Sequence, residues 1–586
     1  MKNRAISIIA ILAVVSALTA CGGIKGSTAS DTGGKSTGGT GGGDTGGGST
    51  GGGGSTGGGG STGGGDVQPP AGTGNTPYLG VHVPTWHADN ARTGLNAKEN
   101  LLTPANVNVS TFGKLFSYQV DGHVFAQPLY VSNVPIGSKL HNVIYVATEY
   151  DSVYAFDADD PGTGAPLWKT SILKSGETPL VGGNPKPWIG ITSTPVIDVA
   201  GKTLYTVGAI SGGKFRLAAI NIETGALRST QEIQASVPST LPEAVNGQLL
   251  LTAACLQRSA LLLTNGTLFM GFGGCPHGWI LSYDAATLQQ IAARSISPNA
   301  DGYGKYPGGG GIWGSGAGPS SDDNGNIFAV TGDGPNDGQN SWGESVLKLN
   351  KNLEILDYFT PAEWAFLTCK DNDLGSAGAM LMPGRNQLVV GGKNSKMFVL
   401  NQGSLGHKQP NNAGAAYSGW YNNSFYSESC TDDKGNVLTD QSADYRIYGT
   451  SAWFEGSIYV GAAPGPIKRF KVGNDGSLSF SSQASQPFAI DSLGTTPAIS
   501  SNSSTNGIVW AVDHGTPFTT PAVLHAYDAL DLSHELYNSS MNAADKAGLG
   551  IKFTAPIVVN GKVYVGSAKD ASLGEVDVYG LLPHSR

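Results

Sequence analysis

From residue 113 onward, short runs of alternating apolar and polar residues recur, separated by turns rich in glycine, asparagine and proline. The runs at 142–148 (Asn-Val-Ile-Tyr-Val-Ala-Thr) and 562–566 (Lys-Val-Tyr-Val-Gly) are typical. Alternation with a period of two places every second side chain on one face, which is the pattern of a β-strand with one buried face. The pattern predicts an all-β domain over residues 113–582.

These strands belong to a longer repeat. Each copy has a Thr/Ala-Pro-apolar start, a turn, an alternating strand and a segment close to Tyr-x-x-Asp-Ala. Copies begin near Pro128, Pro195, Leu261, Pro319, Ala379, Ala452, Pro497 and Pro556. Intervals of about 45 to 73 residues leave room for four strands, which is typical of propeller blades rather than of solenoid turns. We therefore predict an eight-bladed β-propeller, with seven blades as the alternative because the intervals are uneven.

The last copy, at 555–579, has room for only three strands. The segment 113–120 (Gly-Lys-Leu-Phe-Ser-Tyr-Gln-Val) precedes the first copy and resembles a missing outer strand. Chain ends that share a blade close the ring and remove its open edge. We therefore expect this segment to complete the last blade.

The N-terminus has a different pattern. Lys2 and Arg4 precede an apolar stretch at 5–18, and the sequence Leu-Thr-Ala-Cys ends at Cys21. The stretch is too short and wrongly flanked for a membrane span, so residues 1–21 are predicted to be a secretory signal peptide. The last four residues resemble a bacterial lipobox, which implies that Cys21 is lipidated.

Residues 22–75 are mostly Gly, Ser and Thr and hold 26 of the 87 glycines. They lack the apolar residues needed for a core and are predicted to be a disordered tether. Gly22 occupies the position where aspartate tends to retain a lipoprotein at the inner membrane, so we expect the outer membrane or cell surface, on either the periplasmic or the extracellular face. Residues 76–112 are expected to be a lead-in segment.

Composition excludes several classes of protein. The chain is 39% apolar and 8% aromatic, which is enough for a core, and only 13% charged. Coiled coils and helical solenoids need charged repeats that are absent. With 35 basic against 44 acidic residues, a nucleic-acid partner is disfavoured. We expect a monomer that contacts the membrane only through its lipid anchor.

Four cysteines remain besides Cys21, an even number in an exported protein, so two disulfides are expected. Three pairings are possible. Sequence proximity alone favours Cys255–Cys275 and Cys369–Cys430. No Cys-x-x-Cys-His motif occurs, so we expect no haem on this chain.

The blade repeat, with Trp168 closing its first copy, resembles the propeller repeat of proteins that bind pyrroloquinoline quinone (PQQ). Residues 271–401 further resemble quinoprotein alcohol dehydrogenases, which oxidise alcohols with PQQ and a bound calcium. The resemblance implies a propeller fold and a set of site residues. Each of those residues is also consistent with a purely structural role in a core or a turn.

Two motifs imply cofactor and metal ligands. Gly308-Gly-Gly-Gly-Ile-Trp-Gly314 is similar to the stretch whose tryptophan forms the floor under the cofactor, which implies this role for Trp313. Thr331-Gly-Asp-Gly334 is similar to a motif whose asparagine binds calcium. Here the position is Asp333, and a carboxylate is a suitable ligand for a hard cation.

Two more motifs imply catalytic residues. Asp371-Asn-Asp-Leu-Gly-Ser-Ala-Gly378 is similar to the stretch that carries the catalytic base, which implies Asp373, with Asp371 as a second candidate. Gly391-Gly-Lys-Asn is similar to a segment in which a basic residue contacts the quinone oxygens. This implies Lys393 as the electrophile, with Asn394 beside it at the cofactor.

The chain also departs from the family. Its stretch 273–279 aligns with the one that carries a calcium-binding glutamate, and the aligned residue is Gly273. Glu344 is a conceivable replacement. No two cysteines are neighbours, so the adjacent-cysteine disulfide found over the cofactor in many members is absent. Because calcium takes six to eight oxygen ligands, a lost carboxylate weakens the site.

Two functions therefore remain open, and the sequence leaves it uncertain whether the protein is an enzyme. The departures favour a surface-anchored, non-catalytic binding or scaffold module with a protein, glycan or polymer ligand. The alternative is a divergent quinoprotein oxidoreductase that uses PQQ and calcium and acts on alcohols or polyols. The enzyme hypothesis requires Trp313, Asp333, Asp373 and Lys393 to converge near the central channel.

Overall fold

The structure is a computed structural model that describes residues 77–160, 164–182, 187–300, 309–432 and 434–586. The predicted signal peptide, the lipidation site Cys21 and the tether lie outside the described residues. Within the described part of the chain, no helix combines the length and the apolar character needed to cross a membrane.

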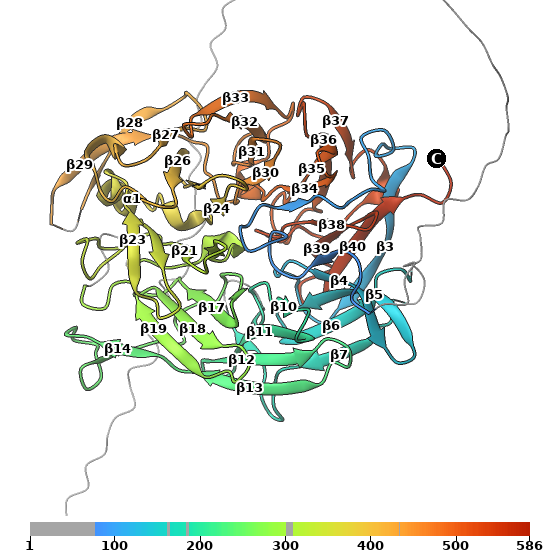
Figure 1. Cartoon of the computed structure of the whole chain (residues 1–586), viewed down its shortest axis with the longest axis horizontal. Helices are drawn as coiled ribbons and strands as arrows, with labels where there is room; N and C mark the ends of the chain where they lie inside the picture. The colour runs from blue at the N-terminus through green and yellow to red at the C-terminus, as the bar shows by residue number, and fades with distance from the viewer. Residues whose placement is uncertain (1–76, 161–163, 183–186, 301–308, 433) are drawn as a thin grey trace, which may run out of the picture. The chain divides into compact units, whose positions relative to one another are not determined.

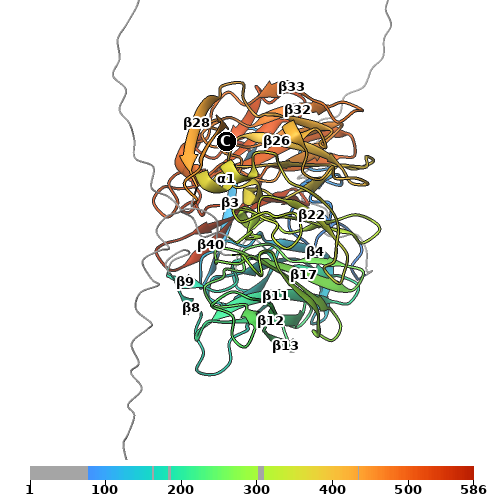
Figure 2. The same ribbon diagram turned by 90° about the vertical axis from the view of Figure 1, so that its left-hand side faces the viewer.

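Eight antiparallel sheets follow one another along the chain and surround a common centre (Figure 1). Figure 2 shows the same sheets from the side. Each sheet has four main strands, so each is one propeller blade. The first strand of every blade begins within a residue or so of a predicted repeat start. The eight-bladed prediction is confirmed, and the seven-bladed alternative is excluded.

Blades 1 to 4 consist of β4 (Leu129–Ile136), β5 (Lys139–Ala147), β6 (Ser152–Asp157) and β7 (Trp168–Ser171); β10 (Val196–Asp198), β11 (Thr203–Ile210), β12 (Lys214–Asn221) and β13 (Leu227–Ile233); β16 (Leu262–Thr264), β17 (Thr267–Phe272), β18 (Trp279–Asp284) and β19 (Gln290–Ser295); and β20 (Ser320–Ser321), β21 (Ile327–Val330), β22 (Val346–Leu349) and β23 (Ile355–Phe359).

Blades 5 to 8 consist of β24 (Met380–Leu381), β25 (Gln387–Gly391), β26 (Lys396–Asn401) and β27 (Tyr417–Trp420); β30 (Ala452–Phe454), β31 (Ser457–Val460), β32 (Lys468–Val472) and β33 (Leu478–Gln483); β34 (Ala498–Asn502), β35 (Thr505–Asp513), β36 (Val523–Asp528) and β37 (Glu535–Asn538); and β38 (Ile557–Val559), β39 (Lys562–Ala568), β40 (Gly574–Leu581) and β3 (Phe112–Val120).

The remaining elements are short: β1 (His82–Val83) and β2 (Leu95–Asn96) on the inner edges of blades 1 and 7; the hairpins β8 (Leu180–Val181) with β9 (Trp188–Ile189), β14 (Ser236–Pro238) with β15 (Gln248–Leu250), and β28 (Tyr426–Thr431) with β29 (Val437–Ser442); helix α1 (Trp364–Lys370); and the 3-10 turns η1 (Gly314–Gly316), η2 (Leu374–Ser376), η3 (Pro410–Asn412), η4 (Ile490–Ser492) and η5 (Ala543–Asp545).

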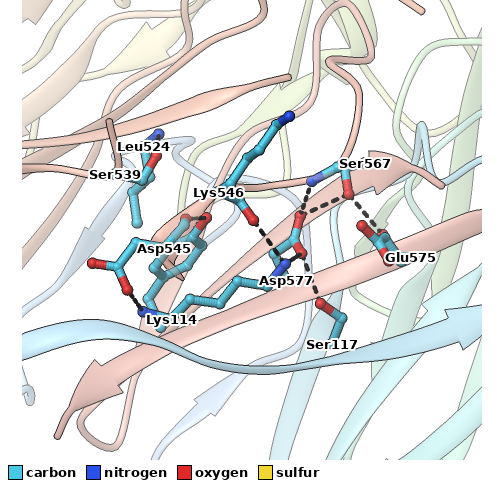
Figure 3. A network of polar contacts seen from close by, with 11 residues as sticks. Lys114, Ser117, Leu524, Ser539, Asp545, Lys546, Ser567, Glu575 and Asp577 are labelled. Carbon is cyan, nitrogen blue, oxygen red and sulfur yellow. Dashed lines mark hydrogen bonds and ion pairs between the residues drawn. The ribbon is translucent and has the colours of Figure 1, made fainter. Parts of the chain in front are cut away.

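The ring closes where the two ends of the propeller chain share blade 8. Strand β3 pairs with β40 as the outer strand of that blade, as predicted for segment 113–120. A buried carboxylate, Asp577, holds this seam together (Figure 3). It lies 2.6 Å from the ammonium of Lys114 and accepts hydrogen bonds of 2.8 Å from the hydroxyls of Ser117 and Ser567. Two of these partners come from β3, so Asp577 joins the first strand of the ring to the last.

We expect Asp577→Ala to lower the free energy of unfolding by about 3 kcal/mol, because it leaves Lys114 and two hydroxyls without their buried partner. Chemical denaturation followed by circular dichroism measures this. The matched control is Lys569→Ala, an exposed residue of the same blade, which should change stability by less than about 0.5 kcal/mol. Equal effects of the two substitutions would contradict this account of the seam.

Residues 82–96 run through the middle of the ring, where the blue segment lies in Figure 1; we call them the hub segment. Strand β1 pairs with β4 of blade 1, and β2 pairs with β34 of blade 7. Between them, main-chain carbonyls accept hydrogen bonds from blades 2, 4, 5 and 6, and side chains donate to blades 3, 4 and 8. One stretch of chain therefore hydrogen-bonds to the inner edge of every blade.

Arg92 is the most connected side chain of the hub segment. It is fully buried, and its guanidinium donates to the carbonyls of Pro319, Leu261 and Trp86 and to the hydroxyl of Thr85, at 2.8 to 3.2 Å. Two of these acceptors belong to the hub segment, and the other two lead into blades 3 and 4. The planar guanidinium has five N–H donors, so one arginine can bind acceptors from several parts of the chain at once.

Arg92→Met should lower the free energy of unfolding by at least about 3 kcal/mol, because several buried acceptors lose their donor while the volume is nearly kept. Lys98→Met, at an exposed site just beyond the hub segment, is the control and should be near neutral. Denaturation curves of both variants test this. A loss below about 1 kcal/mol for Arg92→Met would show that the hub does not depend on it.

The cysteine pairing agrees with the prediction. In the described chain, Cys255 is bonded to Cys275 and Cys369 to Cys430. The second bond ties α1 to the hairpin of β28 and β29. Both bonds agree with export to an oxidising compartment.

Strand direction decides where functional loops gather. Neighbouring strands of each blade are antiparallel, so the chain reverses direction at every strand. As a result, two kinds of connection lie at the same end of the ring: the one between the second and third strands of a blade, and the one from its fourth strand to the next blade. All of the predicted site residues except Cys21 lie in connections of these two kinds. The topology therefore brings them to one end of the ring.

Candidate functional site

The candidate site is built from loops of neighbouring blades. Trp313 lies in the connection from blade 3 to blade 4, and Asp333 lies between β21 and β22 of blade 4. Asp373 lies in the connection from blade 4 to blade 5, and Lys393 and Asn394 lie between β25 and β26 of blade 5. Residues that are up to 81 positions apart in the sequence thus meet around two blades.

Three buried carboxylates form the centre of this site. Asp333, Glu344 and Asp373 each offer an oxygen, and these oxygens all lie within 4.8 Å of one another. The amide of Asp333 donates to Asp373 Oδ1 at 2.8 Å, and the amide of Leu374 donates to Glu344 Oε2 at 2.6 Å. Asp333 Oδ1 and Glu344 Oε1 are buried and accept no hydrogen bond from the described residues. Unpaired carboxylate oxygens in such a cluster suit a bound cation.

Two glycines let the loops approach so closely. A Cβ atom on Gly332 would lie 2.3 Å from Asp373 Oδ1 and 3.2 Å from Trp313 Nε1. A Cβ atom on Gly392 would lie 2.8 Å from the carbonyl oxygen of Asp373. Any larger residue at either position would push Asp373 away from its neighbours. The glycine motifs singled out in the sequence therefore have a steric role at this site.

Lys393 is the positive charge of the site. Its ammonium forms ion pairs with Asp373 and, at 2.5 Å, with Asp371, and the residue is only 4% exposed. It also lies 5.3 Å from the ring centroid of Trp313, within the range of a cation–π contact. Asn394 is buried too, and its side-chain oxygen accepts from the amide of Lys396 at 3.2 Å. That contact shapes the turn that holds Lys393.

The environment separates the pKa values of the three carboxylates. Burial, reinforced by the charges of Asp373 and Glu344, raises the pKa of Asp333 well above its ordinary value. Burial and the charge of Asp373 raise the pKa of Glu344 to about 8. Burial acts in the same direction on Asp373, but Lys393 outweighs it and holds the pKa of Asp373 below its ordinary value. Asp373 is thus the ionised member at neutral pH, as a general base must be.

An aromatic group borders the cluster. Trp313 is half-buried, and its ring centroid lies 6.1 Å from that of Phe553, which enters from the connection between blades 7 and 8. The ring centroid of Tyr448 also lies 6.0 Å from that of Phe553. Lys552 and Arg258 place their charges 5.6 and 5.8 Å from the centroid of Phe553. The site thus combines flat apolar faces with positive charge.

Of the residues predicted from the sequence, Trp313, Asp333, Asp373 and Lys393 come together, with Asn394 beside them. The expectation that a carboxylate is missing is corrected. A side chain at Gly273 would be crowded, because a Cβ atom there would lie 3.1 Å from the Cβ atom of Trp313. Glu344 supplies the third carboxylate from the same loop as Asp333. The sequence named Glu344 only as a conceivable replacement, because no family motif marks this residue, 11 positions after Asp333.

Comparison with known proteins identifies the fold. No protein-family model and no curated protein matches the sequence. Similar solved structures include quinohemoprotein alcohol dehydrogenase ADHIIG from Pseudomonas putida HK5 (14% identity, 85% of this chain and 80% of that chain, TM-score 0.53) and that of Comamonas testosteroni (16%, 85% and 80%, 0.51). A europium-containing methanol dehydrogenase is also similar (12%, 85% and 98%, 0.56). At these identities the likeness shows a shared eight-bladed fold.

Proposed function

We propose that this protein is a quinoprotein oxidoreductase that binds PQQ and a hard cation and oxidises alcohols or polyols. One observation carries the proposal: three buried carboxylates meet beside Lys393 and Trp313. An enzyme of this class needs a cation site, a base, a positive charge and a flat apolar face. Here these four elements share one end of one ring.

The residues present fit a cation. Asp333 and Glu344, whose side chains carry unpaired buried oxygens, would hold it through oxygen atoms, which are the ligands that calcium prefers, with Asp373 beside them. The excess of carboxylate over ammonium also suits a trivalent ion, and one similar structure is described as containing europium. Lys393 neutralises Asp373 in part, so a cation would complete the charge balance that this buried cluster lacks.

The same residues fit the chemistry. PQQ, when bound, supplies the acceptor for the hydride equivalent that leaves the alcohol carbon. Asp373 takes the proton of the substrate hydroxyl, because it is the carboxylate that Lys393 keeps ionised. Lys393 holds positive charge where negative charge develops during oxidation. Trp313 offers a flat apolar face against which a planar ring can pack.

The preference for a non-catalytic module rested on the long tether, the missing adjacent-cysteine disulfide and the absence of a carboxylate at Gly273, and Glu344 answers the last of these. No Cys-x-x-Cys-His motif occurs in the sequence, so electrons would leave through a separate acceptor. The proposal also places the propeller at the outer membrane or cell surface, attached through a lipid on Cys21. The lipobox-like sequence and the tether support this location.

Glu344→Gln should weaken binding of Ca²⁺ or La³⁺ by at least about tenfold, because it removes one anionic ligand. Glu354→Gln, at an exposed glutamate of the same blade, is the control. Binding of the metal salts to the purified chain is measured by isothermal titration calorimetry. Unchanged affinity in Glu344→Gln would rule out a cation in the carboxylate cluster.

Cation affinity should also depend on pH. Burial raises the pKa of Glu344 to about 8, so the empty site holds a proton there below this pH, and a cation must displace it. We expect affinity to fall about tenfold per pH unit below about 8 for each proton released. Calorimetry in buffers of different ionisation enthalpy counts the released protons. An affinity that does not change with pH would contradict the protonated state of the empty site.

The enzyme proposal is tested by titrating the purified chain with PQQ in the presence of Ca²⁺ or La³⁺. We expect saturable binding at micromolar PQQ and alcohol-dependent reduction of a dye. Asp373→Asn should retain the cofactor and lose at least about a hundredfold in turnover, as expected for a lost base. No PQQ binding would leave the non-catalytic module as the better account, and full turnover of Asp373→Asn would refute the assigned base.

A further inference from the structure

Phe553 lies against Trp313 although the two residues belong to loops on different sides of the ring. Their ring centroids are 6.1 Å apart, with the planes tilted by 57°. Both residues are only half-buried, so the protein does not fully cover either ring. Part of each ring surface is therefore accessible to a ligand.

The backbone holds Phe553 in place. Its φ is +70°, in the left-handed region, which is costly for a bulky residue. Its carbonyl oxygen lies 3.6 Å from the position that a Cβ atom of Gly316 would occupy, so the loop lies beside the turn that follows Trp313. Strained conformations of this kind persist where surrounding contacts enforce them, and they cluster at ligand sites.

Positive charge surrounds the two rings. Lys393 lies 5.3 Å from the centroid of Trp313, while Lys552 and Arg258 lie 5.6 and 5.8 Å from that of Phe553. Lys393 is already paired with Asp371 and Asp373, so the charges that a ligand against Phe553 would meet are those of Lys552 and Arg258. Aromatic faces combined with cations favour a planar anion.

We infer that Phe553 is the second aromatic face of a site for a planar polyanion, which binds between Phe553 and Trp313 with Lys552 and Arg258 around its acidic groups. Two stacking distances make about 7 Å, so Phe553 must turn toward parallel with Trp313 and the two rings must move apart to admit a planar ligand. The inference rests on the proposed function for the identity of the ligand, PQQ. It adds a binding residue from the opposite side of the ring.

The test compares Phe553→Ala and Phe553→Leu with the matched control Phe518→Ala. Phe518 is also half-buried, has a φ of +60°, and packs on His123 and Phe125 instead of Trp313. Binding of PQQ with Ca²⁺ to the purified chain is followed by tryptophan fluorescence. We expect both Phe553 variants to bind at least about tenfold more weakly, the usual effect of losing one stacking ring, and Phe553→Trp to bind within about threefold of the original chain.

Phe553→Leu keeps most of the volume and removes only the aromatic face, so it decides the question if Phe553→Ala unfolds. Unchanged or tighter binding in Phe553→Leu would overturn the inference, because the ring would then merely cover Trp313. Equal weakening in Phe518→Ala would do the same.

A second probe, pyrene tetrasulfonate, separates this inference from the proposed function. If pyrene tetrasulfonate binds the unaltered chain and binds Phe553→Leu more weakly, while PQQ does not bind, the polyanion site is supported and the enzyme proposal is refuted. If PQQ binds equally well to the chain and to Phe553→Leu, only the role of Phe553 falls. If neither probe binds the unaltered chain, both fail.

Discussion

The whole arrangement depends on keeping eight blades at a fixed distance from one axis. The hub segment does this, because its fifteen residues hydrogen-bond to the inner edge of every blade. The buried carboxylate of Asp577 then joins the last strand of the ring to the first. Loops from blades 3, 4, 5 and 7 meet only because this circumference is fixed. If the ring opened at blade 8, Phe553, which precedes that blade, would no longer be held against Trp313.

The buried charges at the site are unfavourable for the stability of the folded chain. Three carboxylates are buried within 4.8 Å of one another, two of their oxygens lack a hydrogen-bond donor among the described residues, and one ammonium is shared between Asp371 and Asp373. Such a cluster destabilises the folded chain unless protons or a cation compensate it. Proteins keep locally unfavourable groups of this kind mostly at functional sites. This cost is the physical reason to connect the site with a metal ion.

The aromatic and ionic parts of the site depend on each other. Lys393 touches the face of Trp313 while it keeps Asp373 ionised, so the packing surface and the proposed base share one cation. Gly332 allows both to lie against the same turn. Phe553 closes this assembly from the far side of the ring. The site is therefore one packed unit, and a change in any of its loops would move the others.

The sequence by itself determined the blades, their boundaries and the closing strand, because period-two alternation and proline-led turns are local signals. The favoured cysteine pairing rested on sequence proximity alone, and the structure decided between it and the two other pairings. The sequence also singled out four residues that the structure brings together, Trp313, Asp333, Asp373 and Lys393, because each lies in or beside a glycine motif that tolerates close approach. Only the tertiary structure showed that Glu344 joins the cluster and that Phe553 faces Trp313. Neither carries a local pattern: the position of Glu344 depends on how one loop folds back, and Phe553 arrives from a blade more than 200 residues away. Contacts across the ring form only when the ring closes, and closure brings together residues too far apart in the sequence for any local pattern to predict.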